Sequence, residues 1–393
     1  MAMSRNGNGR HAHIVGWGKY VPSKVITNND LARIVDTSDE WIATRTGIRE
    51  RRVAGPKDTT ASMGLLAARE ALEMAGVRPH EVGLIIVATA TPEHVFPATA
   101  CLIQDALGAV QAGAFDLMAG CTGFMYALAV GAQAVQAGAH NIVLVIGSET
   151  LSRITDWSDR STCVLFGDGA GAVVLRASNA SGGILSTMCR SDGSGGDLLI
   201  VPAGGSKLPA SHQTLDQNLH TIKMNGREVF RFAARILDKS TREVAACAGI
   251  DIKNLELIIP HQANLRIIQA AARSLKLPED RFFVNVQHYG NTSSASIPIA
   301  ICEAVEQGRL KPGDHCVLVG FGAGLTWSAA MVKWGAPEPL HEPTLFERAY
   351  ARVLFAGAGI RSRVVRSVRR VESTLVGPPP PQRIDKDKTR KTK

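Results

Sequence analysis

Short apolar runs alternate with longer stretches whose apolar positions recur at helical spacing, in both halves of the chain. In the first half the short runs, expected to be buried strands, cover residues 13–18, 82–90, 114–117 and 142–146, with a hairpin-like pair at 163–166 and 172–175. The helical patterns there cover residues 60–75, 97–107 and 123–138. In the second half we expect helices at 226–248, 265–275 and 294–307, and strands at 255–259, 282–285, 316–319 and 328–332. This alternation predicts an α/β fold in which helices cover mostly buried sheets.

The two halves also resemble each other in sequence. Residues 120–122 lead to a Gln-Ala-Val-Gln-Ala-Gly segment, and at an offset of 170 residues 290–292 lead to Glu-Ala-Val-Glu-Gln-Gly. A second similarity, at an offset of 153, relates residues 163–171 to 316–324. We interpret these as one duplicated α/β unit with halves at 13–185 and 186–335, because two copies cannot form a solenoid. Chance similarity between helices rich in Gly and Ala is the alternative.

Charge is distributed unevenly along the 393 residues. Residues 336–393 contain 13 Lys and Arg and 6 Asp and Glu, a net charge of +7, so the other 335 residues carry only +2 of the total of +9. A nearly neutral body gives little support to nucleic-acid binding by the main domain.

The basic segment at 336–393 is expected to form a C-terminal extension. Apolar residues spaced among arginines over 345–376 predict a basic amphipathic helix, interrupted at Gly357 and Gly359, and the residues from 378 on are expected to be disordered. We hypothesise that this tail contacts an anionic membrane surface or an acidic partner. A solvated appendage without function is the alternative.

The seven cysteines are odd in number, scattered and free of Cys-x-x-Cys spacing. They therefore favour reduced thiols and a cytoplasmic location over a disulfide framework or a zinc site. No apolar run approaches the ~20 residues of a membrane span, and residues 1–13 lack the apolar core of a signal peptide.

Cys121 is the first candidate for chemistry, because it lies between a buried strand and a predicted helix. A helix N-terminus carries unpaired N–H groups and a partial positive charge, so a thiol there is expected to favour the thiolate. Gly120 and Gly123 on either side suit a tight turn that exposes the residue between them. A buried structural thiol is the ordinary alternative.

Two further polar residues stand in apolar surroundings far along the chain. His261 follows a short strand and a proline, and Asn291 follows Gly290. Taken singly, these are as well explained by a core histidine and a helix cap. Together with Cys121 they supply a nucleophile, an imidazole and a carboxamide, the parts needed for acyl transfer coupled to carbanion formation. The glycine-rich segment 320–324 lacks the spacing of a dinucleotide loop and instead suits a turn with free N–H groups, as an oxyanion hole requires.

With these residues in place, the chain resembles a β-ketoacyl-acyl carrier protein synthase III of the thiolase superfamily. The similarity extends over residues 13–335 and includes the segments 35–51 (VDTSDEWIATRTGIRER), 166–171 (FGDGAG), 260–266 (PHQANLR), 290–298 (GNTSSASIP) and 324–327 (GLTW). The resemblance implies a five-layered αβαβα thiolase-like fold, a homodimer, and no metal or redox cofactor.

The resemblance also implies roles for the candidate residues. The Cys121 thiolate would take an acyl group from acyl-CoA, and malonyl-acyl carrier protein would then lose CO₂ and attack the resulting thioester. His261 and Asn291 would donate hydrogen bonds to the enolate, and the N–H groups of Cys121 and Ala323 would form the oxyanion hole.

Binding residues follow from the same resemblance. It assigns coenzyme A to Trp41, Arg45 and Arg160, although Trp41 alone is equally a half-buried anchor and Arg45 a solvated helix charge. It assigns the acyl pocket to Phe96, reached across the dimer interface. Acyl carrier protein docking is assigned to Gln262, Ala263, Asn264, Leu265 and Arg266, with Arg231 and Arg273 as further contacts for an acidic partner.

The resemblance therefore predicts an acyltransferase that starts fatty acid synthesis. Two alternatives stay open: a related enzyme that primes a polyketide or another specialised lipid pathway, and a non-catalytic scaffold that docks through the basic tail.

Overall fold

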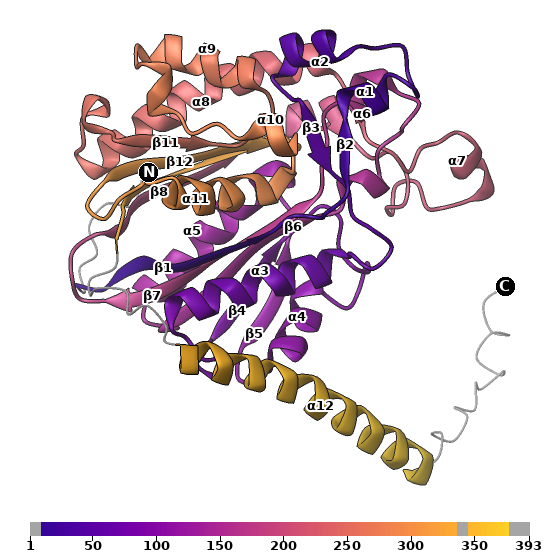
Figure 1. Ribbon diagram of the computed structural model, residues 1–393, viewed down its shortest axis with the longest axis vertical. Coiled ribbons are helices and arrows are strands. Elements are labelled where there is room, and N and C mark those ends of the chain that lie inside the picture. The colour runs from indigo at the N-terminus through magenta and orange to yellow at the C-terminus, as the bar shows by residue number, and fades with distance from the viewer. Residues whose placement is uncertain (1–8, 336–344, 377–393) are drawn as a thin grey trace, which may run out of the picture.

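The computed structural model describes residues 9–335 and 345–376 (Figure 1). The predicted disordered segment from residue 378 on lies outside the described residues. Within the described residues, no helix is both long and apolar enough to cross a membrane.

The first half of the chain forms a five-stranded sheet with the order β1-β7-β6-β4-β5. Its strands are β1 (His11–Tyr20), β4 (Leu84–Ala88), β5 (Gly113–Leu117), β6 (Ile142–Glu149) and β7 (Gly169–Ser178). Strand β4 pairs in parallel with β5 and β6, whereas β7 runs antiparallel to β6 and β1. All residues of β4 and β6 are buried, as expected for strands covered on both faces.

The second half forms a four-stranded sheet with the order β11-β12-β13-β8. Its strands are β8 (Gly183–Ser191), β11 (Leu257–Pro260), β12 (His315–Gly322) and β13 (Thr326–Lys333). Two short ribbons lie beside the sheets: β2 (Val25–Thr27) with β3 (Glu50–Arg52), and β9 (Leu199–Ile200) with β10 (Lys223–Met224).

Helices complete a five-layered αβαβα stack, which confirms the predicted fold. Figure 1 shows the layers from α8 and α9, through the two sheets and the helices between them, to α3 and α4. The outer helices are α3 (Thr60–Ala75), α4 (Thr99–Leu107), α8 (Gly226–Ala248) and α9 (Leu265–Leu275), and the central ones are α5 (Gly123–Gln136) and α11 (Ser296–Glu306). The central helices contact strands of both sheets, and one continuous core, including Phe124, Ile297 and Leu318, fills this layer.

Local capping explains why several helix boundaries follow from the sequence. Helix α3 begins after Thr59, whose side chain accepts a hydrogen bond from Ser62 N–H, and ends at Gly76 in the left-handed conformation. Helix α8 is capped in the same way, with Asn225 as N-cap and Gly249 as C-cap. Short helices α1 (Asn28–Leu31), α2 (Asp39–Thr46), α6 (Arg160–Cys163), α7 (His212–Asp216) and α10 (Val286–Tyr289) lie in the connections.

Two predicted strands are wrong, and one long strand was missed. Residues 163–166 form no hairpin with 172–175, because Cys163 ends α6 and residues 172–175 lie within β7 between β1 and β6. Residues 282–285 make only a single bridge, Phe282 with Ile258. Strand β8 was not predicted, and the proposed boundary between residues 185 and 186 falls inside it.

The two halves repeat one structural unit, but at a different offset from those expected. Strands β4 and β11 begin at residues 84 and 257, helices α5 and α11 at 123 and 296, and strands β6 and β12 at 142 and 315, each pair 173 apart. The offset of 170 is therefore three residues short. The offset of 153 relates segments that are not structurally equivalent, because the counterpart of β12 is β6.

The corrected offset identifies equivalent turns before the two central helices. These are the 3₁₀ turns η2 (Gly120–Thr122) and η7 (Ser293–Ala295), whose first residues have φ of 53° and 49°. The two turns contact each other, and each contacts the central strand of the other half, η2 with β12 and η7 with β6. The structural counterpart of Cys121 is thus Ser294, and Asn291 lies three residues before it.

Two glycines allow this close approach. A Cβ atom at Gly147 on β6 would lie 2.8 Å from the carbonyl carbon of Ser294 in η7. A Cβ atom at Gly322 on β12 would lie 2.7 Å from the Cys121 nitrogen in η2. Both contacts are with backbone atoms, so a side chain could be accommodated only by moving a turn.

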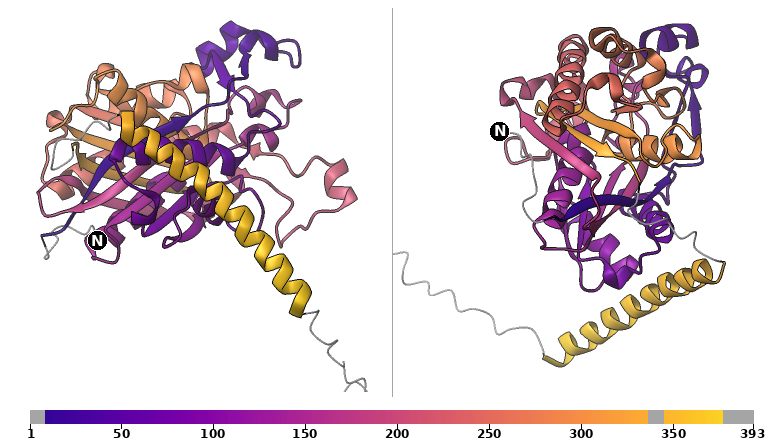
Figure 2. Two further views of the ribbon diagram at one scale, coloured as in Figure 1. Left: turned by 60° about the horizontal axis from the view of Figure 1, so that its bottom comes forward. Right: turned by 90° about the vertical axis from the view of Figure 1, so that its left-hand side faces the viewer.

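The C-terminal extension forms α12 (Leu345–Val376), which packs against α4 at the outer face of the first sheet (Figure 2). The helix is continuous through Gly357 and Gly359, so the predicted interruption is wrong. Phe355 and Ala358 are buried against the body, and this packing outweighs the low helix propensity of two glycines.

Substitution of Gly147 by Ala is expected to separate η7 from β6. We expect a loss of about 1–3 kcal/mol in the free energy of unfolding, the usual cost of overpacking. Urea denaturation of G147A measures this loss. Gly193 is the control, since it has negative φ and a Cβ there would meet nothing within 4 Å; equal stability of G147A and G193A would contradict the close-contact explanation.

Candidate active site

Cys121 lies where strand β5 passes through the turn η2 into helix α5. The positive φ of Gly120 makes this reversal possible at low cost, because glycine has no Cβ. The side chain is buried, with 8% exposure, and lines two adjacent cavities. The sequence therefore placed the thiol correctly at a strand-to-helix turn.

The structure brings His261 and Asn291 to the same place. His261 follows strand β11, and Asn291 lies between α10 and η7, next to Phe166 through a strand-like bridge. Cys121, His261 and Asn291 all line one cavity of about 80 Å³. Three residues separated by 140 and 30 positions in the sequence thus face a common space.

The predicted thiolate of Cys121 does not agree with its surroundings. Burial, aided by the nearby buried Glu149, raises the pKa of the Cys121 thiol to about 11 even after opposing contributions. Hydrogen bonds from the side chains of Ser293 and Asn291 and from its own N–H oppose this rise. The thiol is therefore protonated at neutral pH, and these donors stabilise the thiolate as it forms during attack.

His261 is neutral and held in one orientation. Its Nδ1 lies 2.6 Å from Ser296 Oγ, at the first residue of α11, and its ring packs edge-on against Phe321. Complete burial lowers the pKa of His261 to about 3. The Gln262 N–H donates to Ser296 Oγ, so the hydroxyl hydrogen is free to donate to Nδ1. When this hydroxyl donates to Nδ1, the imidazole proton is on Nε2 and is available as a donor.

Asn291 is oriented by its own turn. Its Oδ1 accepts a hydrogen bond of 2.8 Å from Ser293 N–H, and its backbone pairs with Leu165 and Gly167. With Oδ1 occupied, the amide NH₂ is the group left to donate toward Cys121. The site thus holds two neutral donors, one imidazole and one carboxamide.

Two buried residues near the sulfur were missed in the sequence. Ser293 has a positive φ of 49°, and its side chain is the strongest hydrogen-bond donor to the Cys121 thiolate. Glu149, at the end of β6, accepts hydrogen bonds of 2.7 Å from both Thr91 and Ser294 hydroxyls, and burial raises the pKa of this carboxyl. The only sequence feature that pointed to Glu149 was the polar Ser-Glu-Thr segment at the end of an otherwise apolar strand.

The backbone near the sulfur suits an oxyanion hole. Strand β12 ends at Gly322, so the glycine-rich segment forms the turn into β13, as predicted. Gly322 lies against the Cys121 nitrogen, and a Cβ at Gly120 would lie 3.0 Å from the Ala323 nitrogen. The N–H groups of Cys121 and Ala323 thus lie beside the same turn.

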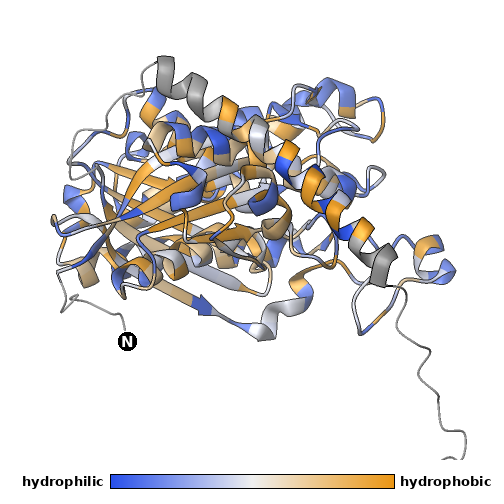
Figure 3. Ribbon diagram, turned by 90° about the horizontal axis from the view of Figure 1, so that it is seen from below, coloured by the Kyte–Doolittle hydropathy of each residue, from blue (hydrophilic) through white to orange (hydrophobic). Residues whose placement is uncertain are grey.

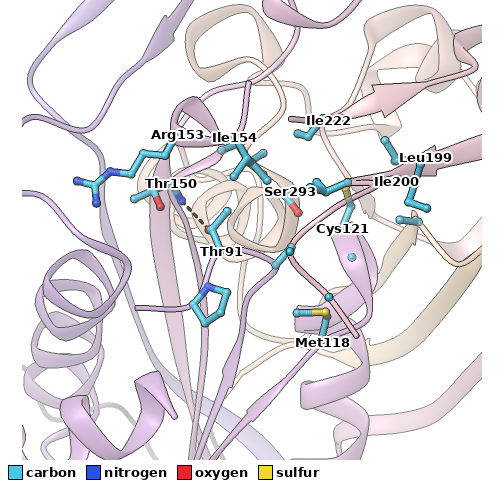
Figure 4. Close-up of a pocket in the computed structure, with 18 of the residues that line it drawn as sticks. Thr91, Met118, Cys121, Thr150, Arg153, Ile154, Leu199, Ile200, Ile222 and Ser293 are labelled. Atoms are coloured by element: carbon cyan, nitrogen blue, oxygen red, sulfur yellow. Dashed lines mark hydrogen bonds between the residues drawn. The ribbon is translucent and has the colours of Figure 1, made fainter. Parts of the chain in front are cut away.

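A second cavity, of about 980 Å³, opens on the other side of Cys121 (Figure 4). Met118, Ile154 and Ile222 line it together with polar groups such as Thr91 and Ser293. Cys121 lies at the junction of this largely apolar space with the small cavity of His261 and Asn291.

The three residues assigned to coenzyme A lie together on the surface. The Arg160 guanidinium lies 4.8 Å from the centre of the Trp41 ring, and that of Arg45 lies 6.0 Å away. An adenine between Trp41 and Arg160 would need roughly 7 Å, twice a contact distance of about 3.5 Å. Arg160, which bonds to Asp36 O at 2.7 Å, would therefore move to admit a base.

The segment assigned to the carrier protein divides into buried and accessible residues. Gln262 is 1% exposed, donates to the carbonyls of Pro260 and Phe283 and accepts from Asn285 N–H, so its side chain cannot contact a partner. Ala263, Asn264 and Leu265 are half-buried and Arg266 is exposed.

Helix α9 and helix α2 meet at this segment. Asn264 caps α9 through Arg266 N–H and donates to Arg45 O at 3.1 Å. Ala263 and Asn264 also line the small cavity. Arg273 is exposed, and Arg231 pairs with Glu228 at 2.9 Å. The surface around Trp41 and the start of α9 therefore borders the small cavity that is lined by Cys121, His261 and Asn291.

Phe96 lies outside both cavities in its own chain. Its side chain is 83% exposed, while the neighbouring Val95 lines the larger cavity and is 92% exposed.

Within residues 9–335 and the described part of α12, no group of three or more His, Cys, Asp or Glu side chains is arranged to hold a metal ion.

The layered fold and the buried Cys, His and Asn define a thiolase-type condensing enzyme. Two family models match: 3-Oxoacyl-[acyl-carrier-protein (ACP)] synthase III over residues 115–193 and its C-terminal counterpart over residues 245–334. The β-ketoacyl-[acyl-carrier-protein] synthase III of Caldanaerobacter subterraneus subsp. tengcongensis is 52% identical over 82% of this chain and 98% of its own length. The chain belongs to the β-ketoacyl-[acyl-carrier-protein] synthase III family.

Solved structures agree with this assignment. The 3-oxoacyl-[acyl-carrier-protein] synthase III of Aquifex aeolicus is 48% identical, with a TM-score of 0.76 over 82% of this chain and 100% of that chain. The priming β-ketosynthase of the R1128 polyketide pathway is 37% identical, with a TM-score of 0.77 over 84% of this chain and 98% of that chain.

Because the pKa of Cys121 lies near 11, its reactivity should rise steadily with pH. We expect the rate of carboxamidomethylation by iodoacetamide to increase ~10-fold per pH unit between about pH 7 and 10. Peptide mass spectrometry follows Cys121, with the exposed Cys101 as an internal reference. A plateau already reached at neutral pH would instead indicate a preformed thiolate.

Replacing Ser296 by Ala should release His261 from its fixed tautomer without touching the nucleophile. We expect the carbon–carbon bond-forming step to slow about 10–100-fold, while acylation of Cys121 and the KM for acyl-CoA stay unchanged. Separate assays of acyl-enzyme formation and of condensation measure the two steps. Ser158, an exposed serine far from His261, is the control position; equal loss in both steps would contradict a positioning role.

Proposed function

We propose that this enzyme transfers an acyl group from acyl-CoA to Cys121 and condenses it with malonyl-acyl carrier protein. The product is 3-oxoacyl-acyl carrier protein, and the reaction starts fatty acid synthesis. The observation that carries this proposal is the position of Cys121 at the junction of two cavities, one largely apolar and one bearing His261 and Asn291.

In the first half-reaction the Cys121 sulfur attacks the thioester carbonyl of acyl-CoA. A carbon–sulfur bond forms, the coenzyme A sulfur leaves, and it takes up the proton that Cys121 loses. The N–H groups of Cys121 and Ala323 stabilise the oxyanion, and Ser293 and Asn291 stabilise the sulfur charge. The 980 Å³ cavity accommodates the acyl chain.

In the second half-reaction the malonyl group loses CO₂, and the electron pair of the broken bond passes into the thioester carbonyl. The enolate oxygen accepts hydrogen bonds from His261 Nε2–H and Asn291 Nδ2–H, so negative charge grows where two donors already point. The enolate carbon then attacks the acyl-enzyme carbonyl, and the Cys121 sulfur leaves as a thiolate and takes up a proton from the solvent. Neutral His261 suits this role, because it donates without requiring a counter-ion.

Substrate binding is proposed at the surface described above. Trp41, Arg45 and Arg160 bind the nucleotide end of coenzyme A, with stacking on the indole and charge toward the phosphates. The exposed Arg266, supported by Arg273, contacts an acidic acyl carrier protein. No metal or redox cofactor enters the reaction.

We also propose a homodimer formed along strand β5, the edge of the first sheet. Phe96 and Met118 are 83% and 70% exposed beside this edge, and Phe115 on β5 is 39% exposed. Burying these apolar side chains in a partner would bring Phe96 of one chain to the larger cavity of the other. Sedimentation velocity tests for the doubled mass.

Seven unpaired cysteines support a cytoplasmic location.

The similarity to a priming polyketide ketosynthase keeps a second function open, the priming of a specialised lipid pathway. Both functions share the chemistry and differ in the acyl primer. A panel of acyl-CoA primers, followed by mass spectrometry of Cys121, distinguishes them by the preferred chain.

Variants of the two donors test the division of labour. We expect H261A and N291A to lose about 10²–10³-fold in CO₂ release from malonyl-acyl carrier protein, because each removes an enolate donor. H261A should retain Cys121 acylation, whereas N291A should also slow it, because Asn291 donates to the Cys121 sulfur as well. The exposed His288 provides the control variant H288A, which should match the unmodified enzyme. Acylation without any CO₂ release in the unmodified enzyme would contradict condensation and leave acyl transfer alone.

A further inference from the structure

Helix α12 is attached to the body by one face only. On that face Phe355, Ala358 and Ser362 are buried, and the Arg69 guanidinium lies 5.0 Å from the centre of the Phe355 ring. The Ser362 hydroxyl bonds to Asp105 on α4, which also lies 4.0 Å from Arg366. These contacts fix which side of the helix faces away from the protein.

The free side carries a second apolar stripe. Its members are exposed by 50–66%: Val353, Ile360, Val364, Val368 and Val371. Their spacings of seven, four, four and three residues keep them on one side of a helix with 3.6 residues per turn, and this side is opposite to Phe355. Figure 3, seen from the side on which α12 lies, shows apolar and hydrophilic segments alternating along the helix.

Every charged residue between positions 353 and 371 is an arginine: Arg361, Arg363, Arg366, Arg369 and Arg370. Arg361 and Arg363 are exposed and flank the stripe on its two sides. A second copy of α12 would therefore meet like charge along its length. The stripe requires an apolar partner surface that is bordered by negative charge.

We propose that α12 docks the enzyme on an anionic lipid bilayer. The five apolar side chains enter the interface, and the flanking arginines contact lipid phosphates. The stripe is about 27 Å long, and the cavity beside α12, lined by Asp105, Ser362 and Arg366 among others, lies on the attached side of the helix and contains none of the stripe residues.

Docking in this orientation keeps the active site accessible. Helix α12 lies beyond α3 and α4, whereas α2 and α9, which border the proposed substrate surface, lie at the opposite end of the stack (Figure 1). The docked enzyme would therefore present this surface away from the bilayer. The C-terminal family model ends at residue 334, so the docking helix is an addition to the family's catalytic fold.

Vesicle flotation of the full chain tests the proposal. We expect binding to phosphatidylcholine vesicles that contain phosphatidylglycerol and little binding to phosphatidylcholine alone. Raising NaCl from about 0.1 to about 1 M, which shortens the Debye length from ~10 to ~3 Å, should weaken binding. The variant I360S/V364S should bind at least ~10-fold more weakly, and R361Q/R363Q about 20–30-fold more weakly.

The matched control replaces equally exposed apolar residues elsewhere. Ile34 and Leu215 are 57% and 60% exposed and lie outside α12, so I34S/L215S should bind vesicles like the unmodified chain. Equal weakening of the control and stripe variants would overturn the proposal. So would absence of vesicle binding combined with a stripe-dependent affinity for soluble acyl carrier protein, which would make α12 a protein-docking helix. Condensation activity in solution is expected to be the same for the stripe variant and the control, which separates this test from that of the catalytic proposal.

Discussion

The contact between the turns η2 and η7 is the constraint on which the active site depends. Each turn starts a central helix of its own half and rests against the central strand of the other half, at Gly322 and Gly147. Because these contacts join backbone to backbone, they leave almost no freedom in how the halves pack. The nucleophile of one half and the carboxamide of the other are thereby held at one place, next to the imidazole that follows β11.

The same packing determines the electrostatics. The side chains of Cys121 and His261 are buried, so the pKa of the thiol rises to about 11 and that of the imidazole falls to about 3. A thiolate–imidazolium pair is therefore disfavoured in the resting enzyme. In the proposed mechanism, catalysis instead relies on neutral, fixed donors that become effective when sulfur or enolate charge develops, which is the condition under which hydrogen bonds contribute most to rate.

The duplicated fold also assigns different tasks to equivalent positions. Cys121 and Ser294 occupy matching places in η2 and η7, yet one is the nucleophile and the other binds the buried Glu149. On the neighbouring strands, Glu149 in β6 corresponds to Gly322 in β12 at the same offset of 173. One half therefore supplies reactive atoms at positions where the other supplies structural support.

The sequence alone determined the helices whose ends carry caps, the α/β order and the basic extension, because periodicity and capping act within a few residues. It also singled out Cys121, His261 and Asn291, which the structure brings to one cavity. It could not determine the offset of the duplication, the burial of Gln262, the approach of Ser293, Glu149 and Ser296 to the site, or the protonation of Cys121. These depend on contacts between segments more than a hundred residues apart and on the water that such contacts exclude. Only the packed tertiary structure decides them.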